Sequence, residues 1–524
     1  MYTFSSKLKT VAIVFMILGI LGIGYGFLTA PTNTAEVEEI LKKESEEHGG
    51  HHAAAGHDAH EAHPAKEAHA TENHAPAAQA HANHDTVAAT EAKPEASMAE
   101  SVHVDTIATT KDTAHAVAST EEHHDDHAAV AAHGHDKTEG GHDAHAEHAA
   151  HTKHVEHVLH QLQNKPWAAV YVAALFFMLI SLGALAFYAI QQVAQAGWSP
   201  VLFRVMQGIT AYLPVGSIIV FVLLALGAFH FHHLFVWMDA DLLDPANPKY
   251  DKLIANKSGY LNEWFWLIRA AVFIIGWNVY RYFSRKNCLA LDEASDNAFY
   301  KKNFKISAGF LVFFIVTESI MSWDWIMSVD PHWFSTLFGW YVFASFFVSG
   351  ITVIALVTLY LKSRGYLEYV NTSHIHDLAK FMFGISVFWT YLWFSQFMLI
   401  WYANIPEEVT YFITRIEQYN LPFFGMVAMN FLFPVLILIN TDFKRLTWII
   451  VMAGVVILAG HYIDFYNMIM PATVGDRWFI GIAEVGSVLF FLGLFIFVVF
   501  TALTKSPLLP KRNPFIEESK HFHY

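Results

Sequence analysis

Apolar stretches of about 20 residues recur ten times along this 524-residue chain. A helix of about 20 apolar residues spans the hydrocarbon core of a bilayer, and inside lipid its backbone polar groups must be satisfied within the protein. The stretches cover residues 9–30, 166–191, 213–236, 262–283, 304–325, 338–361, 379–402, 421–439, 446–466 and 478–501. We therefore predict an all-α polytopic membrane protein with about ten transmembrane helices.

The apolar stretches divide the chain into five predicted regions. The first is a transmembrane anchor, for which a cleaved signal peptide is the alternative. Gly22 and Gly26 in this anchor form a GxxxG spacing that suits close helix packing. The regions are the anchor at 1–30, a His/Ala/acid-rich segment at 31–165, a first four-helix bundle at 166–325, a second at 338–466, and a last transmembrane helix with a tail at 478–524.

Residues 31–165 have few large apolar side chains and hold 24 of the 33 histidines. Such a composition buries too little surface to offset the entropy of ordering, so we expect disorder, with a short helix from about residue 150 into the second span. The simplest interpretation is a solvated spacer. Local proton buffering and weak binding of Zn, Cu or Ni are the alternatives. The candidate metal ligands recur every third residue, for example at His142, His145, His148 and His151.

Charge is distributed unevenly along the chain. The 31–165 segment has 25 acidic and 8 basic residues, and the rest has 22 acidic and 24 basic, although the whole chain carries −15. Basic residues alternate between the short loops, with 18 on one set of flanks and 5 on the other. The positive-inside rule then predicts that both termini are cytoplasmic and that the His-rich segment lies outside.

The single cysteine, Cys288, limits the cofactors that this chain can hold. It excludes a cysteine-ligated iron–sulfur cluster, a CxxCH haem attachment and an intrachain disulfide.

Ionisable residues inside the apolar stretches are the candidate functional residues, because they are costly there and usually face a bundle interior. In the predicted orientation all of them lie in the outer part of their spans. The inner half offers mostly neutral groups such as Asn278, Ser386, Thr390 and Asn430. The proton-pathway candidates are Glu318, Asp324, His461, Asp464, Glu484, His230, His233 and Arg269.

The candidate acids and the arginine differ in their expected roles. Glu318 and Glu484 are predicted to be buried functional carboxyl groups. Asp324 lies among tryptophans, which favours a structural place in the interfacial aromatic belt. Arg269 is expected to neutralise one of these acids.

The candidate histidines fall in two groups. His461 and Asp464 are three residues apart and share a helix face, and the same holds for His230 and His233. Ligation of haem b by these histidines, and a metal site at the HFHH sequence that includes His232, are minor alternatives.

Two strings along the chain echo one another. WDWIMSVDP at 323–331 and IDFYNMIMP at 463–471 each place an aromatic residue directly after an aspartate and a proline seven residues after it. Because they end spans that are four apart, the echo suggests that the two four-helix bundles are related.

Longer strings around these sites resemble a known family. SWDWIMSVDPHWFSTLFGWY and GHYIDFYNMIMP, with the N-terminal MYTFSSKLK, are similar to the F-type, NrfD-like membrane subunit of alternative complex III, in its Bacteroidetes-type form. The similarity covers about 165–505 and the first span, and it excludes the insert. The family residues carried over are Glu318, Asp324, Asp330, His332, His461 and Asp464.

The resemblance implies a place in a bacterial quinol:cytochrome c oxidoreductase of the inner membrane. It implies partner subunits that carry haem c and iron–sulfur clusters, a paralogous membrane subunit, and a proton-pathway role without a cofactor in this chain. Quinol binding by this subunit is the main alternative. An ion or metal transporter and an inert scaffold are further alternatives.

Overall fold

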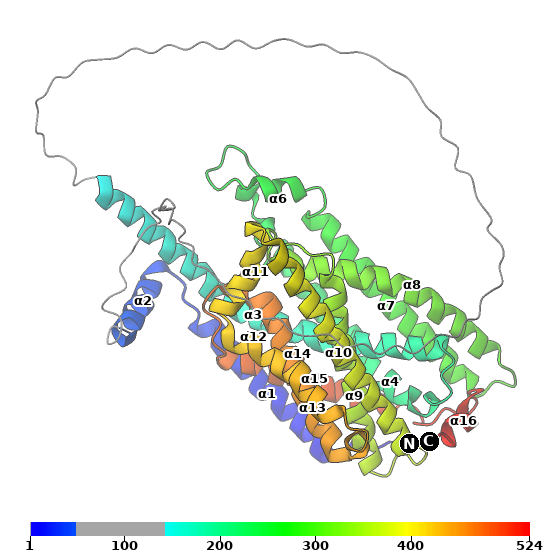
Figure 1. Ribbon diagram of the computed structural model, residues 1–524. Helices are drawn as coiled ribbons and strands as arrows, with labels where there is room; N and C mark the ends of the chain where they lie inside the picture. The colour runs from blue at the N-terminus through cyan, green and yellow to red at the C-terminus, as the bar shows by residue number, and fades with distance from the viewer. Residues whose placement is uncertain (1, 49–141, 524) are drawn as a thin grey trace, which may run out of the picture. The chain divides into compact units, whose positions relative to one another are not determined.

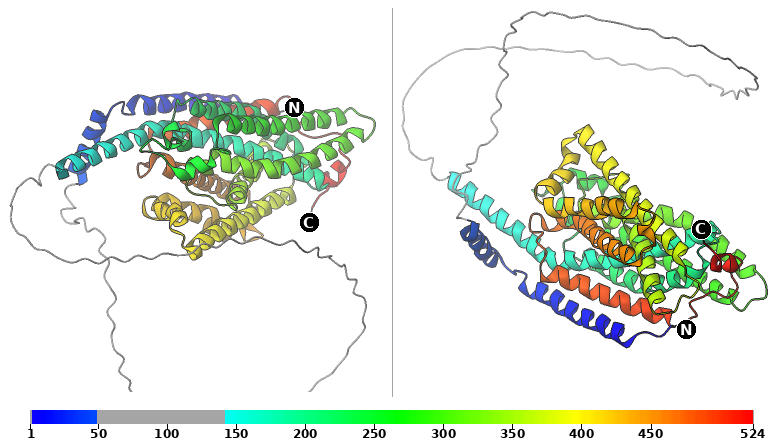
Figure 2. Two further views of the ribbon diagram at one scale, coloured as in Figure 1. Left: turned by 90° about the horizontal axis from the view of Figure 1, so that it is seen from above. Right: turned by 60° about the horizontal axis from the view of Figure 1, so that its bottom comes forward.

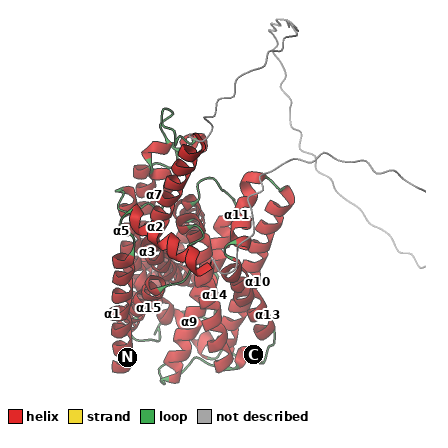
Figure 3. Cartoon of the chain, turned by 90° about the vertical axis from the view of Figure 1, so that its left-hand side faces the viewer, coloured by secondary structure: helices red, strands yellow, loops and turns green. Residues whose placement is uncertain are grey.

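The computed structural model describes residues 2–48 and 142–523, and every regular element in these residues is a helix (Figure 3). Nine helical segments there are long and apolar enough to cross a membrane. This confirms the prediction of an all-α, multi-pass membrane protein. The predicted grouping into two four-helix bundles and the predicted sidedness stay predictions.

The nine spans follow the predicted stretches, with longer helices in most places. They are α1 (Ser6–Thr29), α3 (His142–Val193), the run η1 (Pro200–Leu202), α4 (Phe203–Ile209), η2 (Thr210–Tyr212) and α5 (Leu213–Ala228), then α8 (Ala298–Trp325) with η5 (Met327–Val329), α9 (Phe338–Ser363), α10 (Thr372–Ala403), the run α12 (Asn420–Val427), η6 (Ala428–Leu432) and α13 (Phe433–Leu438), α14 (Thr447–Val474), and α15 (Ile482–Leu503).

The remaining predicted span, at 262–283, coincides with α7 (Glu263–Leu291), which is 29 residues long but is not among the nine. Its polar residues, which include Arg269 and Asn278, lower its hydropathy. Shorter helices lie between the spans: α2 (Thr34–His48), η3 (Val236–Met238), η4 (Ala240–Leu242), α6 (Lys252–Lys257), α11 (Pro406–Glu417), η7 (Phe443–Arg445) and α16 (Ile516–Lys520).

Both described chain ends lie at one end of the helical body (Figure 1). The Tyr2 ring contacts Tyr366 at a centroid distance of 5.0 Å, and Asn371 donates a hydrogen bond to the carbonyl of Phe522 at 2.5 Å. The loop between α9 and α10 therefore holds both ends of the chain. We call this the terminal end of the body, and α6 lies at the opposite end.

The first helix packs on the last span (Figure 2). A Cβ atom added at Gly22 would lie 2.9 Å from the Cα of Gly486, and one added at Gly26 would lie 2.5 Å from the Cβ of Ala483. The two glycines therefore allow α1 and α15 to approach closely, as the GxxxG spacing predicts.

The segment predicted to be disordered is helical at both ends. In α2 and the first part of α3, Val37, Val155 and Val158 are buried in a small apolar cluster. Arg477 also forms an ion pair of 2.5 Å with Glu44 of α2. A few valines and leucines at helical spacing are enough to dock these ends. The disorder predicted for the start of the segment is therefore wrong at α2, whereas the helix predicted from about residue 150 is present as part of α3. Residues 49–141 lie outside the described part.

The third predicted span ends early. α5 stops at Ala228, and the left-handed His230, at φ 60°, follows its C-cap. Phe231 N–H bonds to the Leu226 carbonyl and His230 N–H to the Gly227 carbonyl, each at 2.9 Å. This is the Schellman arrangement that terminates helices.

Candidate functional site

A buried polar cluster joins three of the spans around Asp464. Tyr341 and Ser345 of α9 and Trp389 of α10 all donate hydrogen bonds to the Asp464 carboxylate, and the last two are 2.9 and 2.8 Å long. The Ser345 hydroxyl also lies 2.9 Å from Nδ1 of His461. His461 and Asp464 are both fully buried. The predicted pairing of these two residues on one face of α14 is thus present, with Ser345 between them.

A local widening of the helix supplies a further polar group to this cluster. Residues Ala428–Leu432 form a turn of π-helix, and Asn430 within it places its Nδ2 at 3.4 Å from His461 Nδ1. A Cβ atom at position 460 would lie 2.1 Å from Asn430 Oδ1, so Gly460 makes room for the amide. Single π turns inside helices are frequent at functional sites. Among the described residues, His461 Nε2 has no hydrogen-bond partner.

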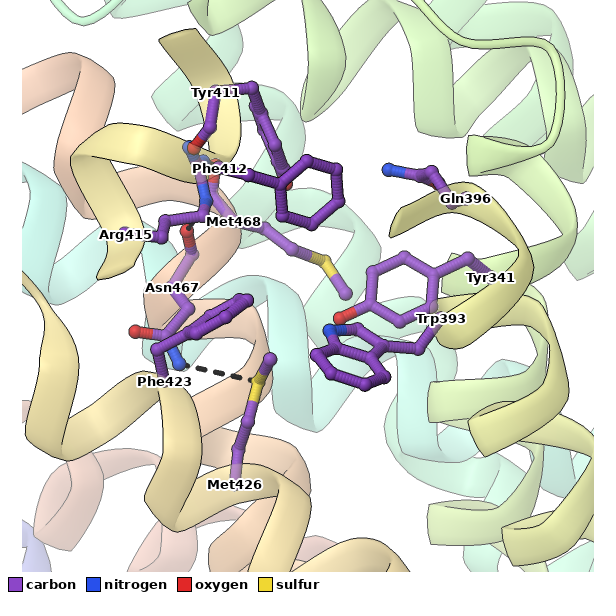
Figure 4. Close-up of a pocket in the computed structure, with 10 residues that line it drawn as sticks. All are labelled: Tyr341, Trp393, Gln396, Tyr411, Phe412, Arg415, Phe423, Met426, Asn467 and Met468. Atoms are coloured by element: carbon purple, nitrogen blue, oxygen red, sulfur yellow. Dashed lines mark hydrogen bonds between the residues drawn. The ribbon is translucent and has the colours of Figure 1, made fainter. Parts of the chain in front are cut away.

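A small cavity adjoins the cluster through Tyr341 (Figure 4). Its volume of about 10 Å³ is close to the smallest space, about 10–15 Å³, that holds one water molecule. The lining residues come from α9, α10, α11, α12 and α14, and they are Tyr341, Trp393, Gln396, Tyr411, Phe412, Arg415, Phe423, Met426, Asn467 and Met468. Because Tyr341 lines this cavity and also donates to Asp464, a single side chain links the cavity to the cluster.

Arg415 in this wall lies between the predicted spans 379–402 and 421–439, where a loop was expected, yet it is only 3% exposed. Its Nε donates to the Asn467 carbonyl at 3.0 Å and its Nη1 to the Tyr411 carbonyl at 2.8 Å. Its guanidinium also stacks on the Tyr411 ring at 3.3 Å. The signal that could have found it is the amphipathic pattern of α11, in which Tyr411 and Arg415 share a face.

Asp324 is neutralised by an arginine, as the sequence suggested for one of the acids. Arg269 binds it through two hydrogen bonds, from Nε at 2.7 Å and from Nη2 at 3.0 Å. The guanidinium also stacks on Tyr260 and Phe265, at 4.0 and 4.3 Å. The Asp324 side chain is fully buried. Paired bonds of this kind hold a carboxylate firmly, which favours a structural role.

Glu318 lies deeper along α8 and is 2% exposed. Ser319 donates to its Oε1 at 2.6 Å, while Oε2 has no partner in the described part of the chain. It does not contact the His461 cluster through any bond that the structure describes. A buried, half-satisfied carboxyl group remains a functional candidate.

Helix ends change the predicted depth of three residues. α14 runs through Pro471 to Val474, which places His461 and Asp464 midway along the helix instead of near its end. Glu484 lies in the first turn of α15, where it accepts a bond from the Gly481 N–H at 2.8 Å. His461 and Asp464 therefore lie further from the end of their helix than predicted, and Glu484 has a capping role, while the outer placement of the candidates stays a prediction.

The histidines after α5 lie outside the span. His232 is buried and contacts the Leu223 carbonyl at 3.0 Å, and burial lowers its pKa. Burial and the neighbouring His160 also lower the pKa of His233. His230 and His233 line a cavity of about 720 Å³ with α3 and the end of α14. Because this stretch is not helical, they do not share a helix face as predicted.

The echo between the two aspartate strings does not extend to their geometry. α8 ends at Trp325, before Pro331, whereas α14 continues through Pro471. Asp324 bonds to a cation and Asp464 to three neutral donors. Of the predicted weak metal ligands, His151 is exposed on α3, and the side chains of His142, His145 and His148 lie outside what the structure describes.

Sequence reasoning missed a neutral network near the terminal end. The Tyr188 hydroxyl is a common hydrogen-bond partner for Gln192, Gln207, Asn303 and Ser284, at 3.0, 3.1, 3.2 and 3.3 Å. All five side chains are buried and come from α3, α4, α7 and α8. Amides and hydroxyls are common in transmembrane helices, so composition alone does not single them out.

An ion pair is connected to this network through Gln207. Arg204, which is 2% exposed, binds Asp292 at 2.5 Å and Gln207 at 3.1 Å. Both charged residues flank apolar stretches in the sequence, where a solvated position is the usual expectation.

No protein-family model and no curated protein matches this chain.

Proposed function

We propose that this protein is an integral membrane subunit of a quinol:cytochrome c oxidoreductase and contributes a proton pathway without a redox cofactor of its own. The observation that carries the proposal is the buried His461–Ser345–Asp464 chain, because it links two proton-exchanging groups through a hydroxyl. The placement in that complex, in the bacterial inner membrane, comes from the resemblance of the 322–341 and 460–471 strings.

The cluster has the chemistry of a relay. A proton on His461 Nδ1 is in reach of the Ser345 oxygen, whose own proton is in reach of Asp464 Oδ2. With the proton on Nε2 instead, Nδ1 accepts from the Asn430 amide. Nδ1 of the imidazole therefore has a hydrogen-bond partner in either tautomer, and its proton can be exchanged with Asp464 through the Ser345 hydroxyl.

Polar groups continue from the cluster on both sides. On one side Tyr341 and the water-sized cavity lead towards Arg415. On the other, Ser349 and Thr352 follow Ser345 along the same face of α9, and all three are fully buried. The Thr352 hydroxyl has no partner within the described residues. About seven residues of helix, or roughly 10 Å, thus carry hydroxyls towards the terminal end.

The test is Asp464→Asn in the intact purified complex, reconstituted in liposomes, with quinol:cytochrome c turnover and proton release recorded together. Asparagine keeps the size and accepts hydrogen bonds but cannot carry the proton. We expect turnover to persist while the proton-to-electron ratio falls. The matched control is Glu407→Gln, in the exposed first turn of α11, which should change neither quantity.

Glu318→Gln is measured in the same assay, because its half-satisfied carboxyl group is the second proton-carrying candidate. An unchanged ratio in both variants overturns the proton-pathway proposal and favours a scaffold. A parallel fall of turnover and ratio indicates quinol chemistry or assembly instead.

Quinol binding is the second candidate function, and one cleft favours it. Glu484 lines an apolar cleft of about 170 Å³ with Tyr462, Tyr466 and Val485, and its Oε1 has no partner among the residues described. An apolar wall with one proton acceptor suits a quinol headgroup. Raised KM for quinol in Glu484→Gln, with the proton-to-electron ratio unchanged, would support this candidate.

A further inference from the structure

Five histidines from two distant parts of the chain line the 720 Å³ cavity at the α6 end of the body; His232 is buried, and the other four are exposed. His157 and His160 come from α3, and His230 and His233 follow α5. The floor is the end of α14, including Thr473 and Gly475. None of these histidines takes part in the proposed proton pathway described above.

The geometry of one pair is close to that of shared ligands. The rings of His160 and His233 have centroids 6.0 Å apart and are inclined by 81°. Zinc binds imidazole nitrogen at about 2.0–2.1 Å in tetrahedral geometry, which places two ligand rings with centroids roughly 5–6 Å apart. The spacing of the His160 and His233 rings therefore falls within the range of two imidazoles that share one ion.

The backbone holds this pair in place. The Asn164 amide Nδ2 donates to the His233 carbonyl and its Oδ1 accepts from the His233 N–H, both at 3.2 Å. Asn164 follows His160 by four residues, so both lie on one face of α3. These two hydrogen bonds from Asn164 therefore hold the His233 backbone beside His160. Less conformational entropy is then lost when one metal ion binds both histidines.

Two further candidate ligands, Asp239 and His230, line the same cavity as His160 and His233. Asp239 lines the same cavity, and His230 lies 3.4 Å from Glu263. Within the described residues no three such side chains already converge as a complete metal site. Because His230 and Asp239 are exposed, rotation of their side chains is not opposed by packing.

We propose that this cavity binds one divalent transition-metal ion of the zinc class, with His160 and His233 as ligands and His230 or Asp239 completing the set. The ion would join α3 to the loop after α5. This site is distinct from the dispersed histidines of residues 49–141, and it does not depend on the proposed proton function.

Zn²⁺ alone is the probe, added to the purified full-length chain in competition with a fluorescent chelator. The dispersed histidines give a weak background, so the measured quantity is one tight equivalent above it. We expect the His160→Ala/His233→Ala variant to lose that equivalent, with at least a tenfold weaker Kd. The matched control is His151→Ala/His154→Ala, which removes two histidines from the same helix and should retain it.

Two further measurements test whether the variants are folded and whether Zn²⁺ binds at the proposed histidines. Thermal unfolding without metal should agree between the two double variants, which shows that the fold is intact. In the wild type, Zn²⁺ should protect His160 and His233, but not His154, from modification by diethyl pyrocarbonate, as read by mass spectrometry. Absence of a tight equivalent in the wild type, or its equal loss in both double variants, overturns the proposal.

Discussion

Two aspartates in similar strings are satisfied in different ways. Asp324 faces a full positive charge on Arg269, whereas Asp464 accepts from neutral Tyr341, Ser345 and Trp389. Loss of one charge from a buried ion pair leaves the other uncompensated, and this is more costly than loss of the whole pair. The same aspartate-to-asparagine change therefore has different consequences at the two sites.

For Asp324→Asn we expect a loss of about 3–5 kcal/mol in the free energy of unfolding, since Arg269, whose side chain is only 10% exposed, is left without its counter-ion. Asp464→Asn should lose only about 1–2 kcal/mol, because the asparagine amide still accepts some of the neutral donors. Cys288, which is 6% exposed and the chain's single cysteine, reports unfolding through a thiol-reactive dye.

The double variant Arg269→Gln/Asp324→Asn is the control for this charge argument. It should be more stable than Asp324→Asn alone. Equal losses in the single and double variants would show that the hydrogen bonds, and not the unpaired charge, account for the effect.

His230 has the left-handed conformation that glycine adopts without strain. A non-glycine residue there costs roughly 1–2 kcal/mol. His230→Gly should therefore raise the unfolding midpoint and His230→Val should lower it, measured with the same thiol dye. A lower midpoint for the glycine variant would mean that the contact between His230 and Glu263 outweighs the backbone strain.

At single positions the sequence predicted which side chains are unusual but not their partners. Glu318, Asp464 and His461 stand out because ionisable groups are rare in apolar stretches. Their partners depend on which helices are neighbours, and that is decided by packing over the whole body. Arg415 was missed because a short amphipathic helix between spans resembles a loop when only charge is counted.

At the scale of helices, the predicted ends of the spans were the main error. Hydrogen bonding and backbone conformation at the helix ends explain the differences. α5 ends eight residues before the predicted limit because His230 completes a terminating motif, although the apolar pattern continues to Val236. α14 runs eight residues beyond its predicted limit. Hydropathy reports which segments are apolar, whereas capping and turn geometry decide where a helix stops.

The contact between α1 and α15 gives a prediction with a close control. Gly22→Leu places a side chain against the Gly486 backbone, where a Cβ alone comes within 2.9 Å. Overpacking of this kind costs about 1–3 kcal/mol, so the unfolding midpoint should fall. Gly24→Leu is the matched variant, because no described atom lies within 4 Å of its added Cβ, and it should behave as wild type.

A fall of the same size in both glycine variants would contradict this account. It would indicate that leucine in α1 is harmful through helix insertion or solubility instead of through the contact with α15.

At the scale of the whole molecule, the sequence suggested that the His-rich region is a simple spacer, whereas the structure shows that α2 and the first part of α3 pack together at its two ends. If this segment were only a solvated spacer, deletion of residues 48–160 would be largely tolerated. The buried Val155 and Val158 belong to the cluster with Val37 of α2, and His157 and His160 line the 720 Å³ cavity. A deletion through residue 160 removes all four of these α3 residues.

We therefore predict different outcomes for two deletions joined by the same flexible glycine–serine linker of about 20 residues. Removal of 49–141 leaves α2, α3 and the ion pair between Arg477 and Glu44 intact, so the unfolding midpoint should stay near that of the full chain. Removal of 48–160 exposes Val37 and lowers the midpoint. Because both deletions remove the dispersed histidines, equal midpoints would mean that the docking of α2 on α3 adds no stability, and that the apolar spans alone hold the body together.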